Sequence, residues 1–149
     1  MNAAWLGLAA RALLGLVLVF SGTMKTAGPV EEFAVIIDYY RILPEGSSMA
    51  AAAIIPWIEI LAGLALALGY FTRQAAAAAG AMLGVFILAI VSTKVRGFEL
   101  PSCGCFGHGV HLTQTQAILV DSGLLAMAFA AFKSGSRNIS LDNWIASGL

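Results

Sequence analysis

Long runs of hydrophobic residues, separated by short polar stretches, dominate the pattern along this chain. Four runs approach or exceed the length of about 20 apolar residues that a helix needs to cross the hydrocarbon core of a membrane. They fall at about residues 3–24, 50–71, 74–93 and 116–132. The pattern predicts an all-α membrane protein, a four-transmembrane-helix bundle within residues 1–133, followed by a polar C-terminal tail at 134–149.

The connection between the first two runs has a helical pattern of its own at about residues 29–42. Pro29 can open a helix, and Glu31 and Glu32 suit its first turn, where the helix dipole favours negative charge. Apolar residues recur at i, i+3, i+4 and i+7: Phe33, Ile36, Ile37 and Tyr40. We expect an amphipathic surface helix, with its stripe turned either to lipid or onto the end of the bundle as a lid.

Composition supports the membrane assignment and excludes one class of partner. Hydrophobic residues make up 60% of the chain and charged residues 11%, against roughly 45–50% and 25% in soluble domains. Net charge is zero, so nucleic acid is not an expected partner, whereas the lipid bilayer is. Basic residues flanking the spans divide evenly between the two sides and leave the orientation open: Lys25, Arg41, Lys94 and Arg96 against Arg73, Lys133, Arg137 and the intramembrane Arg11.

The third connection, residues 94–115, contains the only two cysteines, Cys103 and Cys105, within the sequence CGCFG. With four spans, this connection and residues 29–42 emerge on the same side of the membrane. Idle cysteines behave as small hydrophobes, whereas this pair lies in a glycine-rich loop. A metal site with His108 and His111 is a second interpretation, but zinc usually has two to four residues between paired cysteines.

A redox-active pair is the favoured interpretation of Cys103 and Cys105, and no metal site is predicted. A disulfide between them would close a very small ring and add little stability. Such a bridge should be strained, and strained, exposed disulfides are the labile or catalytic ones. Reactivity therefore explains the spacing better than stability does.

Three ionisable residues lie within the predicted spans, where charge is costly and often functional: Arg11, Glu59 and Asp121. Arg11 and Glu59 lie at similar depths in antiparallel helices, which predicts a buried ion pair. This pair could simply fix helix register, or it could form a proton or quinone-headgroup site together with Trp57. Asp121 is expected to pair with Lys25 or Lys94.

Over about residues 8–130 the chain resembles the MauE branch of the DoxX-like redox-associated integral membrane proteins. The shared elements, in chain order, are Arg11, Ser21, Gly22, Lys25, Phe33, Tyr40, Leu43, Pro44, Pro56, Glu59, the CGCFG sequence at 103–107 and Asp121. One departure is Val120, where the family often has arginine.

The resemblance implies a multi-pass protein of a bacterial-type cytoplasmic membrane that works with a thioredoxin-like periplasmic partner. It also implies that the CGCFG loop faces the periplasm and that both termini are cytoplasmic. We therefore expect a membrane thiol–disulfide oxidoreductase in which Cys103 and Cys105 exchange electrons with that partner. The expected membrane carrier is a quinone near Arg11, Trp57 and Glu59, and no covalently bound cofactor is expected.

The alternative is a non-enzymatic membrane subunit or assembly factor whose CGCFG loop docks a partner or holds a metal. The sequence leaves open the direction of electron flow, the attacking cysteine and the oligomeric state.

Overall fold

The computed structural model describes residues 3–44, 46–97 and 112–134. These residues form helices and no strand: α1 (Ala3–Ala27), α2 (Val30–Tyr39), α3 (Ser48–Leu68), α4 (Thr72–Val95) and α5 (Gln114–Ser134). Four of them, all but α2, are long and apolar enough to cross a membrane. The predicted all-α fold with four spans and a short helix after the first is confirmed.

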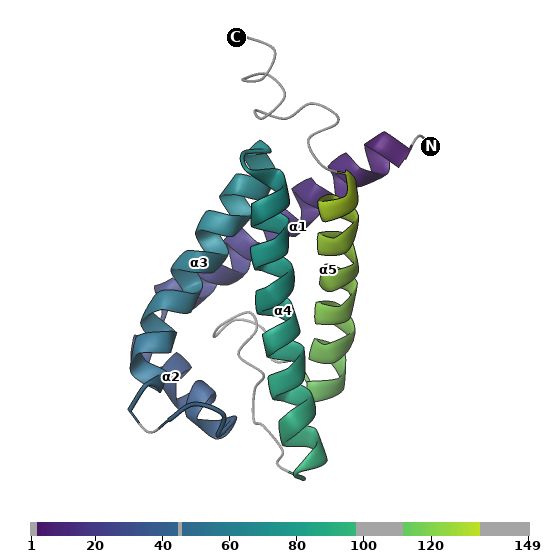
Figure 1. Ribbon diagram of the computed structural model, residues 1–149. Coiled ribbons are helices and arrows are strands. Elements are labelled where there is room, and N and C mark those ends of the chain that lie inside the picture. The colour runs from purple at the N-terminus through teal and green to yellow at the C-terminus, as the bar shows by residue number, and fades with distance from the viewer. Residues whose placement is uncertain (1–2, 45, 98–111, 135–149) are drawn as a thin grey trace.

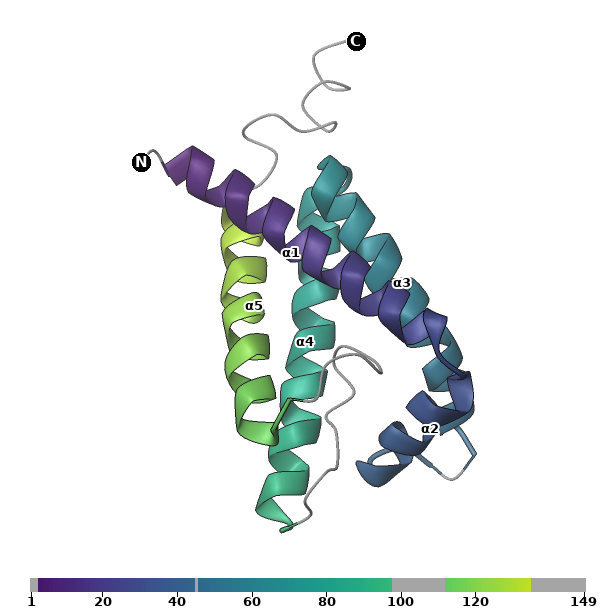
Figure 2. The ribbon, with the colours of Figure 1, turned by 180° about the vertical axis from the view of Figure 1, so that it is seen from behind.

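The helices form two closely packed pairs. Helix α1 packs against α3, α4 packs against α5, and α1 also contacts α5. Figures 1 and 2 show α1 crossing the bundle obliquely, with α2 at the end where α1 and α4 finish and α5 begins. The first and third connections therefore leave the same end of the bundle, as span counting predicted.

Glycines allow α1 and α3 to approach until their backbones are in contact. A Cβ atom on Gly15 would lie 2.7 Å from the carbonyl oxygen of Gly63, and one on Gly63 would lie 2.7 Å from that of Gly15. Two turns further along α1, a Cβ on Gly22 would lie 2.7 Å from the carbonyl oxygen of Pro56. Small residues at these positions let two membrane helices pack closely, and they set the register of α1 against α3.

The turn between α3 and α4 lies at residues 69–71, earlier than the predicted connection at 72–73. Gly69 adopts a left-handed conformation with φ of 71°. The Tyr70 N–H donates to the Ala65 carbonyl (2.8 Å) and the Gly69 N–H to the Leu66 carbonyl (3.2 Å), a common way to end a helix at glycine. The prediction was wrong here because Tyr70 and Phe71 continue the apolar run past the real helix end.

Helix α2 is a lid on the end of the bundle. Phe33 and Ile37 of α2 are buried, as is Tyr40 directly after it, whereas Val35 and Tyr39 on the other face are exposed. Phe33 and Ile37 pack in a cluster with Ala52 of α3. The apolar stripe therefore faces the bundle, and the interpretation in which it faces lipid is wrong. The helix is also shorter than the predicted range of 29–42.

The two ends of the cysteine-bearing connection are tied together. Thr113 and Gln116 cap α5 reciprocally, with the Thr113 N–H donating to Gln116 Oε1 (3.1 Å) and the Gln116 N–H to Thr113 Oγ1 (3.4 Å). Lys94 Nζ of α4 donates to Thr115 Oγ1 of α5 (3.1 Å). Helix α4 ends at Val95 and α5 begins at Gln114, so each extends by two residues into the predicted loop of 94–115. Its central residues, including Cys103 and Cys105, and the tail from 135 onward lie outside the described residues.

Candidate functional site

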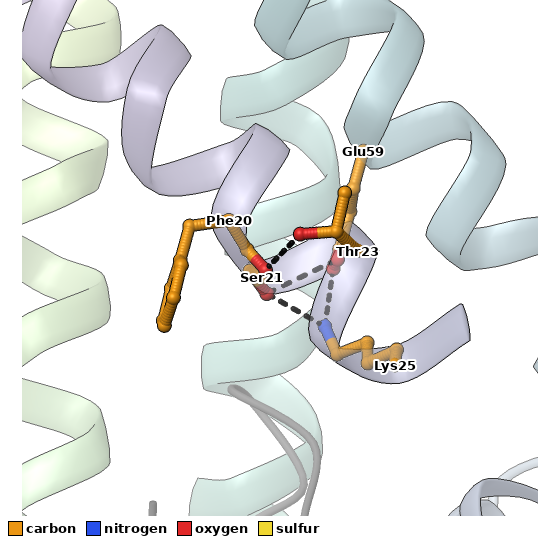
Figure 3. A network of polar contacts seen from close by, with 5 residues as sticks. All are labelled: Phe20, Ser21, Thr23, Lys25 and Glu59. Atoms are coloured by element: carbon orange, nitrogen blue, oxygen red, sulfur yellow. Dashed lines mark hydrogen bonds and ion pairs between the residues drawn. The ribbon is translucent and has the colours of Figure 1, made fainter. Parts of the chain in front are cut away.

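A buried ion pair joins α1 to α3 near the end of the bundle that α2 covers. Lys25 Nζ lies 2.5 Å from Glu59 Oε1, and the two side chains are only 1% and 2% exposed. Ser21 Oγ accepts a hydrogen bond from Lys25 Nζ (3.1 Å) and donates one to Glu59 Oε2 (3.1 Å). Figure 3 shows the three polar groups converging between the two helices. Both carboxylate oxygens of Glu59 are therefore hydrogen-bonded, which a buried charge requires.

The close packing of α1 and α3 brings these side chains together. Ser21 and Lys25 are four residues apart and so share one face of α1. Gly22 lies between them, and its missing side chain leaves room for Pro56 and the Cβ of Glu59. A larger residue at 22 would separate the helices at the level of the ion pair. The local sequence and the packing therefore position the same site.

The remaining helices contribute the surroundings of the ammonium group. Lys25 Nζ lies 5.4 Å from the ring centroid of Phe33 on α2 and 5.1 Å from that of Phe86 on α4, within cation–π range. Asp121 of α5 is buried and lines, with Lys25 and Glu59, a cavity of about 20 Å³. That volume is about enough for a single water molecule. All five helices thus meet around one buried charged cluster.

The predicted pair of Arg11 with Glu59 is wrong. Glu59 faces Gly22, and Arg11 lies eleven residues earlier on α1, about 16 Å away at 1.5 Å per residue. Lys25 takes the place that the sequence suggested for Arg11. The contact between Gly15 and Gly63 sets a register of α1 against α3. In this register Arg11 and Glu59 do not lie at the similar depths that the sequence had suggested.

Trp57 also differs from its expected role. Trp57 is 60% exposed, two residues from the buried Glu59, and so points outward from the bundle. Arg11, Trp57 and Glu59 are therefore not brought together around one pocket. Among the described residues, the polar contacts of Lys25 are to Ser21 and Glu59, and Lys94 bonds to Thr115. Asp121 lines the same small cavity as Lys25, and its expected pairing with Lys25 or Lys94 stays a prediction.

From the sequence, Lys25 is expected to flank the first span and to be a candidate partner of Asp121, so its pairing with Glu59 was missed. Helix α1 continues through Lys25 to Ala27 and places the side chain inside the bundle. A signal was available, since Ser21 and Lys25 have helical i, i+4 spacing. No group of three or more His, Cys, Asp or Glu side chains that could hold a metal occurs in the part of the chain that the structure describes.

Comparisons with known proteins agree with this architecture. A family model described as "Methylamine utilisation protein MauE" matches residues 3–134, which include every described helix. Among relatives called "Methylamine utilization protein MauE", the one from Paracoccus denitrificans is 29% identical over 85% of this chain and 68% of its own length. The relative from Paracoccus versutus is 34% identical over 83% of this chain and 66% of its own length.

A third relative of the same name, from Methylorubrum extorquens, is 30% identical over 68% of this chain and 54% of its own length. The chain therefore spans about two thirds of the Paracoccus relatives and about half of the third. No solved structure matches it. With the family model covering all four apolar helices of spanning length, this chain is a multi-pass membrane protein that belongs to the MauE family.

Proposed function

We propose that this protein is a membrane thiol–disulfide oxidoreductase in which Cys103 and Cys105 alternate between a dithiol and a disulfide. The observation that carries the proposal is the buried Lys25–Glu59 pair. Buried charge in a membrane bundle is expensive and commonly functional. Lys25 lies two residues before the end of α1, and α1 ends at the end of the bundle where α4 finishes and α5 begins.

The proposed partners are a thioredoxin-like protein in the periplasm and a quinone in the membrane. In the oxidising direction, a partner thiolate attacks the Cys103–Cys105 disulfide, and resolution of the mixed disulfide leaves the partner oxidised and this chain as a dithiol. Two electrons and two protons then pass from the dithiol to the quinone, which becomes a quinol. The relatives' names further support a role in methylamine utilisation for this chain.

The redox state of the cysteines tests the proposal directly. Membranes quenched in acid and treated with a mass-tagged maleimide should show a native chain with no tag, because the disulfide blocks both thiols. Prior reduction should add two tags, and the single variants Cys103→Ser and Cys105→Ser should accept one. Depleting the membranes of quinone should shift the native chain toward the two-tag form.

Two results would contradict the redox function. One is a pair of thiols that stays free without reductant; the other is stoichiometric zinc or copper bound at the cysteines of the purified protein. Either result would favour the non-enzymatic alternative, in which the CGCFG loop docks a partner or holds a metal during assembly. An unchanged redox state in quinone-depleted membranes would remove the quinone alone.

We also propose that the CGCFG loop faces the periplasm and that both termini face the cytoplasm. In intact spheroplasts, reduced Cys103 and Cys105 should react with a membrane-impermeant maleimide. A matched control is Gln74→Cys in the chain lacking both native cysteines, because Gln74 is exposed beside the α3–α4 turn at the opposite end. That cysteine should react only after lysis, and the reverse labelling pattern would invert the proposed topology.

A further inference from the structure

A second, larger cavity lies next to the charged cluster, between α2, α3 and α4. It has a volume of about 200 Å³ and an almost wholly apolar lining that includes Phe33, Ile37, Ala51, Ile55, Val85 and Phe86. A cavity of about 150 Å³ with similar walls is enough to hold benzene. This cavity therefore has room for one six-membered ring with small substituents.

The cavity reaches the outer surface of the apolar bundle. Val85, in the middle of α4, lines the cavity and is 62% exposed. Ile42 and Leu43, which follow α2, also line the cavity and are exposed. A mouth edged by exposed apolar side chains on a membrane-spanning helix opens toward lipid. A ligand would therefore enter from the bilayer rather than from water.

The inner wall of the cavity separates it from a hydrogen-bond donor. Phe33 and Phe86 line the cavity, and Lys25 Nζ lies within 5.4 Å and 5.1 Å of their ring centroids. An ammonium group has three N–H donors, and the hydrogen bonds of Lys25 to the described residues use two of them, to Ser21 and Glu59. The third donor remains for an acceptor that reaches between the two rings.

We propose that this cavity binds the carbonyl-bearing ring of a membrane-soluble quinone, with Lys25 donating a hydrogen bond to one ring oxygen. The cavity supplies an apolar slot with aromatic walls, and Lys25 supplies a charged hydrogen-bond donor that fixes orientation, as is usual in small-molecule sites. A lipid acyl chain would use the slot but has no acceptor for the ammonium. The site replaces the location near Arg11 and Trp57 that the sequence suggested.

A competing location for an apolar ligand is the groove of about 610 Å³ between α4 and α5. Its lining residues, such as Ala77, Gly80 and Phe129, include none of the charged cluster. Ser122 also lines the groove, but its hydroxyl donates to the Ile118 carbonyl of its own helix (2.6 Å), so the groove offers a quinone carbonyl no charged donor. The smaller cavity is the better match to a quinone ring.

This inference rests on the proposed function only for the source of the electrons, which is the Cys103–Cys105 dithiol. The two cysteine S–H bonds break and one S–S bond forms, while the quinone gains two electrons and two protons and becomes a quinol with two O–H bonds. Lys25 would pass a proton to the nearer oxygen and regain one of the two that the thiols release. The ammonium is unchanged at the end of the cycle.

Photolabelling tests the cavity without measuring activity. The full chain in lipid nanodiscs is irradiated with an azidoquinone, with decylubiquinone or decylbenzene as competitor, and the labelled peptides are mapped. Label should fall on α2 or on α4 near Phe86, and decylubiquinone alone should compete. Ala51→Leu, which fills the cavity, should weaken labelling about tenfold. Lys25→Met should weaken it to a similar degree.

Ala53→Leu is the matched control, because Ala53 is exposed on the same helix and does not line the cavity. Equal labelling of Ala51→Leu and Ala53→Leu would overturn the proposal, as would competition by decylbenzene as strong as that by decylubiquinone. Specific labelling together with permanently free cysteines would instead sustain this site and reject the proposed oxidoreductase. A cysteine pair that cycles between dithiol and disulfide, without labelling of the cavity, would sustain the oxidoreductase and reject this site.

Discussion

Replacing Lys25 with methionine should lower the free energy of unfolding by about 3–5 kcal/mol, the cost of breaking a buried ion pair by removing one partner. Methionine keeps most of the apolar length of the side chain, so the loss comes from the ammonium group. Glu59 would then remain buried without its ion-pair partner. Among the described residues, only Ser21 would still donate a hydrogen bond to its carboxylate. A buried charge in that condition is among the most costly defects that a fold can carry.

The double variant Lys25→Met/Glu59→Gln should recover most of this loss, because the charge of Glu59 is removed together with that of its partner and Ser21 can still bond to the glutamine. Unfolding in mixed dodecyl maltoside and SDS micelles, followed by far-UV circular dichroism, measures both variants. Lys94→Met is the matched control, since Lys94 is exposed and makes one hydrogen bond to Thr115. If Lys25→Met were as stable as Lys94→Met, the pair would not be buried as described.

The double variant also separates stability from function. If it folds like the native chain but no longer reoxidises its cysteines, then the ion pair serves the reaction. If it folds and reoxidises normally, then the pair only fixes the register of α1 against α3. The second outcome would remove the observation that carries the proposed function.

Replacing Gly63 with alanine should destabilise the protein by about 1–3 kcal/mol, the usual cost of overpacking a close contact. The new Cβ would lie 2.7 Å from the Gly15 carbonyl oxygen and 2.9 Å from the Val19 backbone nitrogen. Backbone atoms cannot move aside as the end of a flexible side chain can, so α1 and α3 must separate. Separation at Gly63 would also strain the contact of Ser21 with Glu59 further along the pair.

Gly84→Ala is the matched control, because a Cβ at Gly84 would meet nothing within 4 Å. Alanine is the better helix former, so this variant should be equal to the native chain or more stable by about 0.5–1 kcal/mol. The same micelle unfolding assay compares the two variants. Equal stability of Gly63→Ala and Gly84→Ala would show that the α1–α3 contact is looser than the glycine geometry requires.

Much of the architecture could be predicted because it depends on local patterns. The four apolar runs specify four spanning helices, since backbone groups in lipid must be satisfied within the segment itself. The spacing of Phe33, Ile37 and Tyr40 specifies one apolar face on α2. Counting spans places α2 and the ends of the cysteine-bearing connection at one end of the bundle. Each of these conclusions needs only the order and polarity of residues.

The helix ends were less predictable for a physical reason seen at two places. At Gly69 a left-handed glycine ends α3 although apolar residues continue beyond it. At Lys25 a charged residue continues α1 although polarity suggested that the span had ended. Hydrophobicity reports only whether a side chain prefers water or lipid. The left-handed backbone of Gly69 ends α3, and the ion pair with Glu59 lets Lys25 remain inside the bundle as part of α1.

The sequence by itself determined the class of protein, its four spans, the short amphipathic helix after the first span and the presence of costly charges at Arg11, Glu59 and Asp121. Only the tertiary structure decided that Glu59 pairs with Lys25, that Trp57 points outward and that an apolar cavity lies behind Phe33 and Phe86. Periodicity fixes the face that a residue occupies on its own helix. The register between helices depends on how closely their backbones meet, and here the contact between Gly15 and Gly63 selects the partner of Glu59.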